Sequence, residues 1–365
     1  MKKHLFAYLF LFSMMVLTFL IHATSSSLIE TYYALSFNKW FIQFLSHCTG
    51  VFPFSLFEIG IYSLFLYLAT LLCSWCYIAF KKRSTLKAHT IKVGCHLFYL
   101  AALLIVLFYW EWGFNYNRVP LSTTLNLTQS TFTSKELGDL YNYLIEEANA
   151  LRPFITEDEK GHMIIPGGYE RVFATADLGY LELSKFYPIF YGSYGKPKPI
   201  LSSILMNYTG ITGIYSPFTG EANVNIAILP QALPYTTLHE MAHQRGFASE
   251  DECNFIAFLA CSVHPDITFK YSGYLLALAY TNNALSGADP ELLKALNAKL
   301  SDQVRSDIHY NNLFWSQYSG PIEKASSKVN DTYLKANGIH DGERSYGRMV
   351  DLLLSYYQDY LVSTP

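Results

Sequence analysis

The sequence predicts a mostly helical α+β protein built in two parts, a membrane module over residues 1–114 and a folded domain over residues 115–365. Three observations support this prediction. Apolar runs with few or no charges recur through the first third of the chain. Helical spacing of apolar residues dominates the rest, and only residues 160–232 combine frequent Gly and Pro with the alternation of short strands. In composition, 51% of the 365 residues are hydrophobic and only 15% are charged, which favours a membrane portion.

The membrane module contains three predicted transmembrane helices. Each is long enough to cross a hydrocarbon core of about 30 Å, and they cover residues 5–21, 55–80 and 91–114. The first segment, which follows Lys2 and Lys3, also fits a signal peptide, and both interpretations stay open. Residues 28–54 are apolar but interrupted by charges, Gly50 and Pro53. We therefore expect a pair of helices on the outer surface there, not a fourth span.

The densest basic cluster of the chain sets the predicted topology. Lys81, Lys82, Arg83 and Lys87 lie in the short loop between the second and third spans. The positive-inside rule places this loop in the cytoplasm, so the domain after residue 114 is expected outside a cytoplasmic membrane. The lipid bilayer is therefore an expected partner. Nucleic acid is not, because the net charge is −3 and no basic patch accompanies the folded domain.

The folded domain begins with a predicted helix over residues 133–151, introduced by the capping box Thr133–Glu136. Short strands follow, including 213–216 and 221–228. Further helices are predicted near residues 235–246, 250–264, 268–284, 290–308, 310–336 and 343–361. Apolar stretches within them are too short to span a bilayer and are expected in the core.

The strongest chemical signal is the sequence His239-Glu240-Met241-Ala242-His243. On a helix, the two histidines lie one turn apart on one face, where both can bind a single Zn²⁺ ion, and Glu240 can act as general base toward zinc-activated water. The alternative is a solvated surface helix. Pro234 as a helix start, apolar neighbours and Gly246 as a helix stop favour an active-site helix.

The third zinc ligand is less clear from the sequence. Ser249 occupies the place where metzincins carry a third histidine, which argues against that group. Glu252 opens the next helix, as the third ligand does in glutamate-type zincins, and we expect it to bind the metal. Asp251, Glu250 or a residue from elsewhere remain alternatives. Glu252 could also merely close a capping box with Ser249.

The chain as a whole resembles a family of bacterial membrane proteins known as domain of unknown function 3810. The resemblance runs from Asn38 onward and includes GIYSPFTGEAN at 213–223, the stretch 239–261 around the HExxH motif, and residues 117–121, 194–199, 329–335 and 345–352. It implies a multi-pass membrane protein with an extracytoplasmic zincin-like domain. It implies no particular reaction.

Two further features have weaker support. A second electrophile often stabilises the oxyanion in zinc hydrolases, and Tyr346 is our candidate, with Arg344 and Tyr215 as alternatives. The strand over residues 221–228 could bind a substrate backbone along its edge or be an ordinary core strand. His264, by contrast, has no partner at ligand spacing and is expected to be a surface histidine or one with its hydrogen bonds satisfied, not a metal ligand.

Together these features predict a membrane-anchored zinc metallohydrolase, a peptidase or amidase acting on a peptide or amide substrate at the outer membrane face. One zinc ion would be held by His239, His243 and Glu252. The alternative is a non-catalytic membrane scaffold or receptor with a structural or degenerate metal site. The sequence leaves the oligomeric state open.

Overall fold

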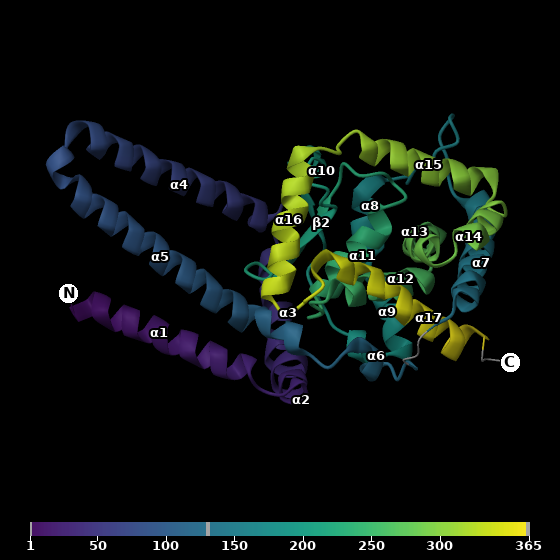
Figure 1. Ribbon diagram of the computed structural model, residues 1–365, viewed down its shortest axis with the longest axis horizontal. Helices are drawn as coiled ribbons and strands as arrows, with labels where there is room; N and C mark the ends of the chain where they lie inside the picture. The colour runs from purple at the N-terminus through teal and green to yellow at the C-terminus, as the bar shows by residue number, and fades with distance from the viewer. Residues whose placement is uncertain (1, 129–131, 363–365) are drawn as a thin grey trace.

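The computed structural model describes residues 2–128 and 132–362. The predicted ranges 1–114 and 115–365 also contain residues 1, 129–131 and 363–365, which lie outside the described part. Helices make up 73% of the chain and strands 4%, which confirms the mostly helical prediction. Figure 1 shows α1 (Lys2–His22), α4 (Leu56–Lys81) and α5 (Leu86–Glu111) extending to the left of a helical body.

Two helices in the described part are long and apolar enough to cross a membrane. They are α4 and a stretch that joins the short η2 (Arg83–Thr85) to α5. The first segment packs against α5, where Leu11 meets Ala102 and Val106 and the Trp110 indole donates a hydrogen bond to Thr18. In Figure 1 the N-terminus and the α4–α5 turn lie at the same far end of the group.

Residues 26–50 form one helical run, not the predicted pair of helices. It consists of α2 (Ser26–Leu28), the π-helix η1 (Ile29–Asn38) and α3 (Lys39–Gly50) without a break. This run is bent by 110° from α1, so the two could form one broken span or a re-entrant element. The charges at Glu30 and Lys39 do not break the run, since both residues are part of its helices. Glu30 forms an ion pair with Arg118.

The body follows α5 directly. In chain order it contains η3 (Gly113–Asn117), α6 (Leu121–Thr124), α7 (Ser134–Leu151), η4 (Arg152–Phe154), α8 (Gly168–Thr175), α9 (Asp177–Phe186), η5 (Pro188–Phe190), β1 (Lys198–Ile200), α10 (Ser203–Asn207), β2 (Gly213–Ser216) and β3 (Glu221–Asn225). Then come α11 (Leu233–His243), α12 (Glu250–Ser262), α13 (Ile267–Ala288), α14 (Pro290–Asn297), α15 (Asp302–Ser316), α16 (Pro321–Ala336), η6 (Gly342–Arg348), α17 (Met349–Tyr356) and η7 (Tyr357–Val362).

Three of the predicted helices are divided. The range 290–308 breaks between α14 and α15, because the Ser301 side chain caps a new helix by accepting from Val304 N–H. The range 310–336 breaks at Gly320, whose extended backbone precedes Pro321 at the start of α16. The range 343–361 divides into η6, α17 and η7.

The sheet has three strands in the order β1-β3-β2. β3 pairs in parallel with β1 and antiparallel with β2, and all five of its residues are buried. Both sides of β3 are therefore occupied, so the predicted strand 221–228 is a core strand and cannot add a substrate along an edge. Its regular part also ends at Asn225, where the Asn225 side chain turns the backbone by accepting from Ala227 N–H.

Charged side chains on the sheet join it to the helices of the predicted membrane module, α1 to α5 with η1 and η2, which are called the membrane-side helices below. Glu221 of β3 accepts hydrogen bonds from the N–H groups of Leu56 (3.1 Å) and Phe57 (2.9 Å), the first residues of α4. Lys198 of β1 donates to three carbonyls at the end of α3, those of Thr49, Gly50 and Phe52. Each charge opposes the partial charge of the helix end that it contacts. The body is thus fixed to the membrane-side helices at their ends.

Candidate metal centre

The HExxH motif forms the last turns of α11. Pro234 stands at the start of this helix, where its missing N–H costs nothing. The helix α11 packs against β2 and β3 of the sheet and against α12 and α13. The helix ends at His243, and Gly246 then adopts φ +84°, a left-handed conformation that reverses the chain toward α12.

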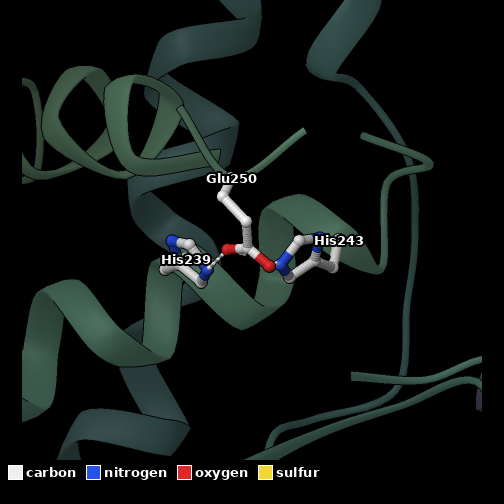
Figure 2. Close-up of side chains that lie close together, drawn as sticks. All are labelled: His239, His243 and Glu250. Atoms are coloured by element: carbon white, nitrogen blue, oxygen red, sulfur yellow. Dashed lines mark ion pairs between the residues drawn. The ribbon is translucent and has the colours of Figure 1, made fainter. Parts of the chain in front are cut away.

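The structure brings His239, His243 and Glu250 together. Glu250 Oε2 lies 3.1 Å from His239 Nε2 and 3.6 Å from His243 Nε2. One ligand atom from each residue lies within 4.8 Å of the other two. Figure 2 shows the carboxylate reaching from the start of α12 into the space between the two imidazoles.

These spacings fit a zinc ion. Ligand atoms about 2.0–2.1 Å from zinc at tetrahedral corners lie about 3.3 Å from each other. Two imidazole nitrogens and one carboxylate oxygen are also a donor set typical of catalytic zinc, which leaves the fourth position for water or substrate. The three side chains are only 10–16% exposed, so the site is largely screened from bulk solvent.

His243 is oriented by a contact behind its ring. Its Nδ1 lies 2.8 Å from the Phe247 carbonyl oxygen, which can only accept a hydrogen bond. Nδ1 must therefore carry a proton, and Nε2, which faces Glu250, is the nitrogen left to bind a metal once it releases the proton that it otherwise donates to Glu250. The Cys253 thiol donates to the same carbonyl and lies 3.3 Å from Nδ1.

Glu240 lies beside the group of His239, His243 and Glu250, against Gly213 of β2. Burial raises the pKa of Glu240 to about 7, although the two nearby imidazoles and a hydrogen bond from the Tyr215 backbone lower it. A Cβ on Gly213 would lie 2.4 Å from Glu240 Oε1, so this side chain fits only because Gly213 has none. Glu240 Oε2 is buried and has no hydrogen-bond partner within the described residues. A buried carboxylate oxygen without a donor is suited to accept one from a water molecule or a substrate.

Glu250 occupies the place in which the sequence predicted Glu252. Burial raises the pKa of Glu250, but attraction from His243 and hydrogen bonds from both imidazoles outweigh this and hold its pKa well below its usual range. Glu252 instead accepts a hydrogen bond from Leu121 N–H at 2.6 Å. Two residues along a helix are separated by about 200° of rotation, so the two glutamates point to opposite sides of α12. The alternative role for Glu252, a capping box with Ser249, does not form either, because the Ser249 side chain makes no capping hydrogen bond.

Asp251 and the predicted oxyanion candidates are also placed by the structure. Asp251 pairs with Arg348 of η6 at 3.1 Å and not with the histidines. Tyr346, also on η6, lies close enough to Glu250 for that charge to raise the pKa of its phenol further, after burial has raised it. The Tyr215 ring lies 6.4 Å from the His243 ring, and its hydroxyl is buried without a partner in the described part of the chain. Arg344 is exposed.

The membrane-side helices contribute a wall of the site. Trp112, the residue directly after α5, packs edge-on against His243 with ring centroids 6.0 Å apart, and against Tyr215 at 4.7 Å. Tyr116 of η3 and Tyr333 of α16 share a hydrogen bond at 3.1 Å. Burial raises the pKa of both phenols, and the charge of Glu250 raises it further. Trp112 lies near the end of the predicted span 91–114, and no local signal in the sequence links it to a motif more than a hundred residues away.

Comparison with known proteins gives one family. A family model described as "Protein of unknown function (DUF3810)" matches residues 33–354. No curated protein and no solved structure matches the chain.

Proposed function

The chain belongs to the DUF3810 family of proteins of unknown function, and from its site geometry we propose that it is a membrane-anchored zinc metallohydrolase that cleaves peptide or amide bonds. The observation that carries this proposal is the convergence of His239, His243 and Glu250 beside a buried fourth group, Glu240. Two nitrogen ligands and one oxygen ligand are a donor set used by zinc hydrolases, and the glutamate of an HExxH helix serves them as general base. The proposal includes a zincin-like body over residues 115–365, attached to a membrane module over residues 1–114.

The roles of the residues follow from their positions. When bound, zinc would supply Lewis-acid chemistry by polarising the substrate carbonyl and acidifying water. Glu240 would accept the proton of the attacking water and return it to the leaving amine, since a pKa of about 7 suits both transfers near neutral pH. Tyr346 would donate a hydrogen bond to the oxyanion that develops on the carbonyl oxygen. The wall of Trp112 and Tyr215 would limit access of bulk water.

We place the site on the outer face of a cytoplasmic membrane. Lys81, Lys82, Arg83 and Lys87 all lie at the α4–α5 turn, at the end of these helices far from the body. If that turn is cytoplasmic by the positive-inside rule, the body and its metal centre lie outside.

The test compares four forms of the full-length protein purified in detergent: wild type, Glu240→Gln, His239→Asn and the exposed control Glu159→Gln. We expect one zinc per chain in wild type, Glu240→Gln and Glu159→Gln, and none in His239→Asn. Hydrolysis of quenched-fluorescent peptides should fall by about 10²–10⁴-fold in Glu240→Gln and be unchanged in Glu159→Gln. A zinc-loaded wild type that hydrolyses no amide would show that the metal serves only the fold. A fully active Glu240→Gln would rule out Glu240 as the general base.

A further inference from the structure

The height of the metal centre relative to the membrane-side helices is fixed by direct contacts. Besides Glu221 and Lys198, Glu58 of α4 accepts hydrogen bonds from the N–H groups of Leu201 and Ser202, both at 2.9 Å. Arg118 connects Glu30 of η1 to the carbonyl of Gly246, in the loop between the two ligand-bearing helices. The body is therefore held by direct contacts and not only by a flexible linker, so the distance between its metal centre and the ends of the membrane-side helices is fixed.

The site also lies within one side chain of the end of α5. This helix ends at Glu111, and the next residue, Trp112, touches the ring of His243. If α5 crosses the bilayer, a bond cleaved at this centre lies at the membrane surface. A substrate must then bring its scissile bond to that surface, which is most simply achieved by a hydrophobic anchor of its own.

An apolar cavity of about 350 Å³ lies at the bend between α1 and η1. Its lining includes Ile21, Leu28, Ile29 and Tyr33 from α1, α2 and η1, and Trp110 and Phe114 from α5 and η3. None of the lining side chains that the structure describes is charged. The cavity opens to the outside of the protein, since its lining residue Leu28 is 50% exposed, and it lies beside α5, a candidate span that contributes Trp110 to the lining. Its size and lining suit a flexible hydrocarbon chain, while a transmembrane helix about 10 Å wide is too thick for it.

The cavity and the metal centre share one wall. Trp110 and Phe114 face the cavity, and Trp112, between them in the chain, faces His243. The wall is held from the cavity side by Tyr33, whose hydroxyl donates to the Trp110 carbonyl at 3.1 Å and whose ring packs edge-on against Phe114 at 5.3 Å. A chain bound in the cavity is thus anchored on the other side of a single short segment from the ligand histidines.

We propose that the substrate is a peptide carrying an acyl chain, and that this chain occupies the cavity while the scissile amide reaches the metal centre. This rests on the proposed function and specifies its substrate class. The acyl chain is the occupant that matches the uncharged lining, the volume and the position beside lipid-facing helices.

The first test measures hydrolysis in lipid nanodiscs of phosphatidylethanolamine and phosphatidylglycerol. One mixture of quenched-fluorescent peptides is supplied unmodified, palmitoylated, or fused to a transmembrane helix. We expect the palmitoylated peptides to be cleaved at least about tenfold faster than the unmodified peptides. Equal rates for these two, or a higher rate for the helix-fused peptides, would overturn the proposal.

Acylation also concentrates a peptide at the bilayer, so a matched pair of variants separates binding from partitioning. Leu28→Trp fills the cavity, whereas Leu35→Trp adds the same side chain at a residue of η1 that is 42% exposed and does not line the cavity. We expect the ratio of palmitoylated to unmodified rates to fall in Leu28→Trp and to persist in Leu35→Trp. A ratio that survives in Leu28→Trp would contradict a role for the cavity.

A third test does not depend on catalysis. A peptide acylated with a diazirine-bearing palmitoyl chain is photocrosslinked to the Glu240→Gln protein and the adducts are mapped by mass spectrometry. Adducts within residues 21–37 and 110–114 that disappear in Leu28→Trp support the acyl site. If they form but no peptide is hydrolysed by wild type, the proposed function fails and the acyl site stands. If peptides are hydrolysed without such adducts, the hydrolase stands and the acyl site fails.

Discussion

Arg118 and Glu30 form a two-point ion pair, with Nε 2.9 Å from Oε2 and Nη2 2.6 Å from Oε1. The pair is nearly buried, since the side chains are 6% and 12% exposed. The remaining guanidinium nitrogen donates to the Gly246 carbonyl at 2.8 Å, and the guanidinium lies over the Phe247 ring. Phe247 is also the residue whose carbonyl orients His243. The ion pair therefore connects the membrane-side segment to the shell around a proposed ligand.

Replacing Arg118 with Lys should weaken zinc binding. Lysine keeps the charge but cannot contact both carboxylate oxygens and the Gly246 carbonyl at once. We expect a loss of roughly 10–100-fold in zinc affinity, as for other groups that orient metal ligands. Competition with a chromophoric chelator measures this. Arg171→Lys is the control. Arg171 is 44% exposed in its pair with Asp266, and such an exposed ion pair contributes little, so zinc affinity should not change. Equal zinc affinity in wild type and Arg118→Lys would refute the connection.

The two glutamates of α12 should behave differently when replaced by glutamine. Glu250→Gln should lower zinc affinity by more than about 100-fold, since groups that only orient ligands are already worth roughly 10–100-fold. Glu252→Gln should keep full zinc occupancy, because Glu252 contacts the Leu121 backbone and not the histidines. Metal analysis after dialysis distinguishes them. The reverse pattern would restore Glu252 as the ligand.

Tyr346→Phe should retain zinc but lose turnover. Removing a single oxyanion donor costs about 10²–10³-fold in kcat in other hydrolases, and Phe preserves the packing of the ring. The matched control is Tyr208→Phe, since Tyr208 is 45% exposed in the short turn after α10. Steady-state kinetics on the peptides described above provides the measurement. If kcat is unchanged in Tyr346→Phe, another group stabilises the oxyanion.

Glu221→Gln should destabilise the junction between the sheet and α4. The carboxylate serves two backbone donors at a helix N-terminus, where a negative charge is favourable, and the residue is 1% exposed. We expect a loss of about 1–3 kcal/mol in the free energy of unfolding, observed as a lower Tm in detergent. The exposed Glu159→Gln should leave Tm unchanged. A Tm equal to that of wild type would mean that the junction does not limit stability.

His264 should make the protein less stable in mild acid. Burial lowers the pKa of His264, although a hydrogen bond with the Thr175 carbonyl and the charges of Asp266 and Asp177 raise it. Its Nδ1 accepts from Asp266 N–H, which only the neutral ring can do. Because the folded pKa lies below the unfolded value of about 6.5, the unfolded chain binds the proton more readily, and stability falls as pH drops below that value.

The measurement is Tm at pH 7.5 and 5.5 in wild type and His264→Gln. The variant should be less stable at pH 7.5 but show a smaller drop between the two pH values, with the difference limited to about 1.4 kcal/mol per pH unit. If the two proteins show the same drop, other groups cause the acid sensitivity.

The amino-acid sequence by itself determined the features that depend on local periodicity. Apolar runs long enough to cross a membrane became α4 and α5, and His239 and His243 meet because positions four apart always share a helix face. The proposed role of Glu240 followed from its position between the two histidines in the motif. The same local signals failed at Ser301 and Gly320, where one helix ends and a new one begins. Periodicity alone does not show where a long helical pattern divides into two helices.

Tertiary structure decided which acidic residue joins the histidines and what surrounds them. The sequence favoured Glu252 over Glu250 and Asp251. The choice depends on how α12 is rotated when it packs against α11, and this rotation leaves Glu252 beside Leu121. Likewise, only the folded chain brings Trp112 against His243 and Arg118 against Gly246. Such contacts join residues more than a hundred positions apart, and packing, unlike helix periodicity, leaves no regular pattern in the sequence.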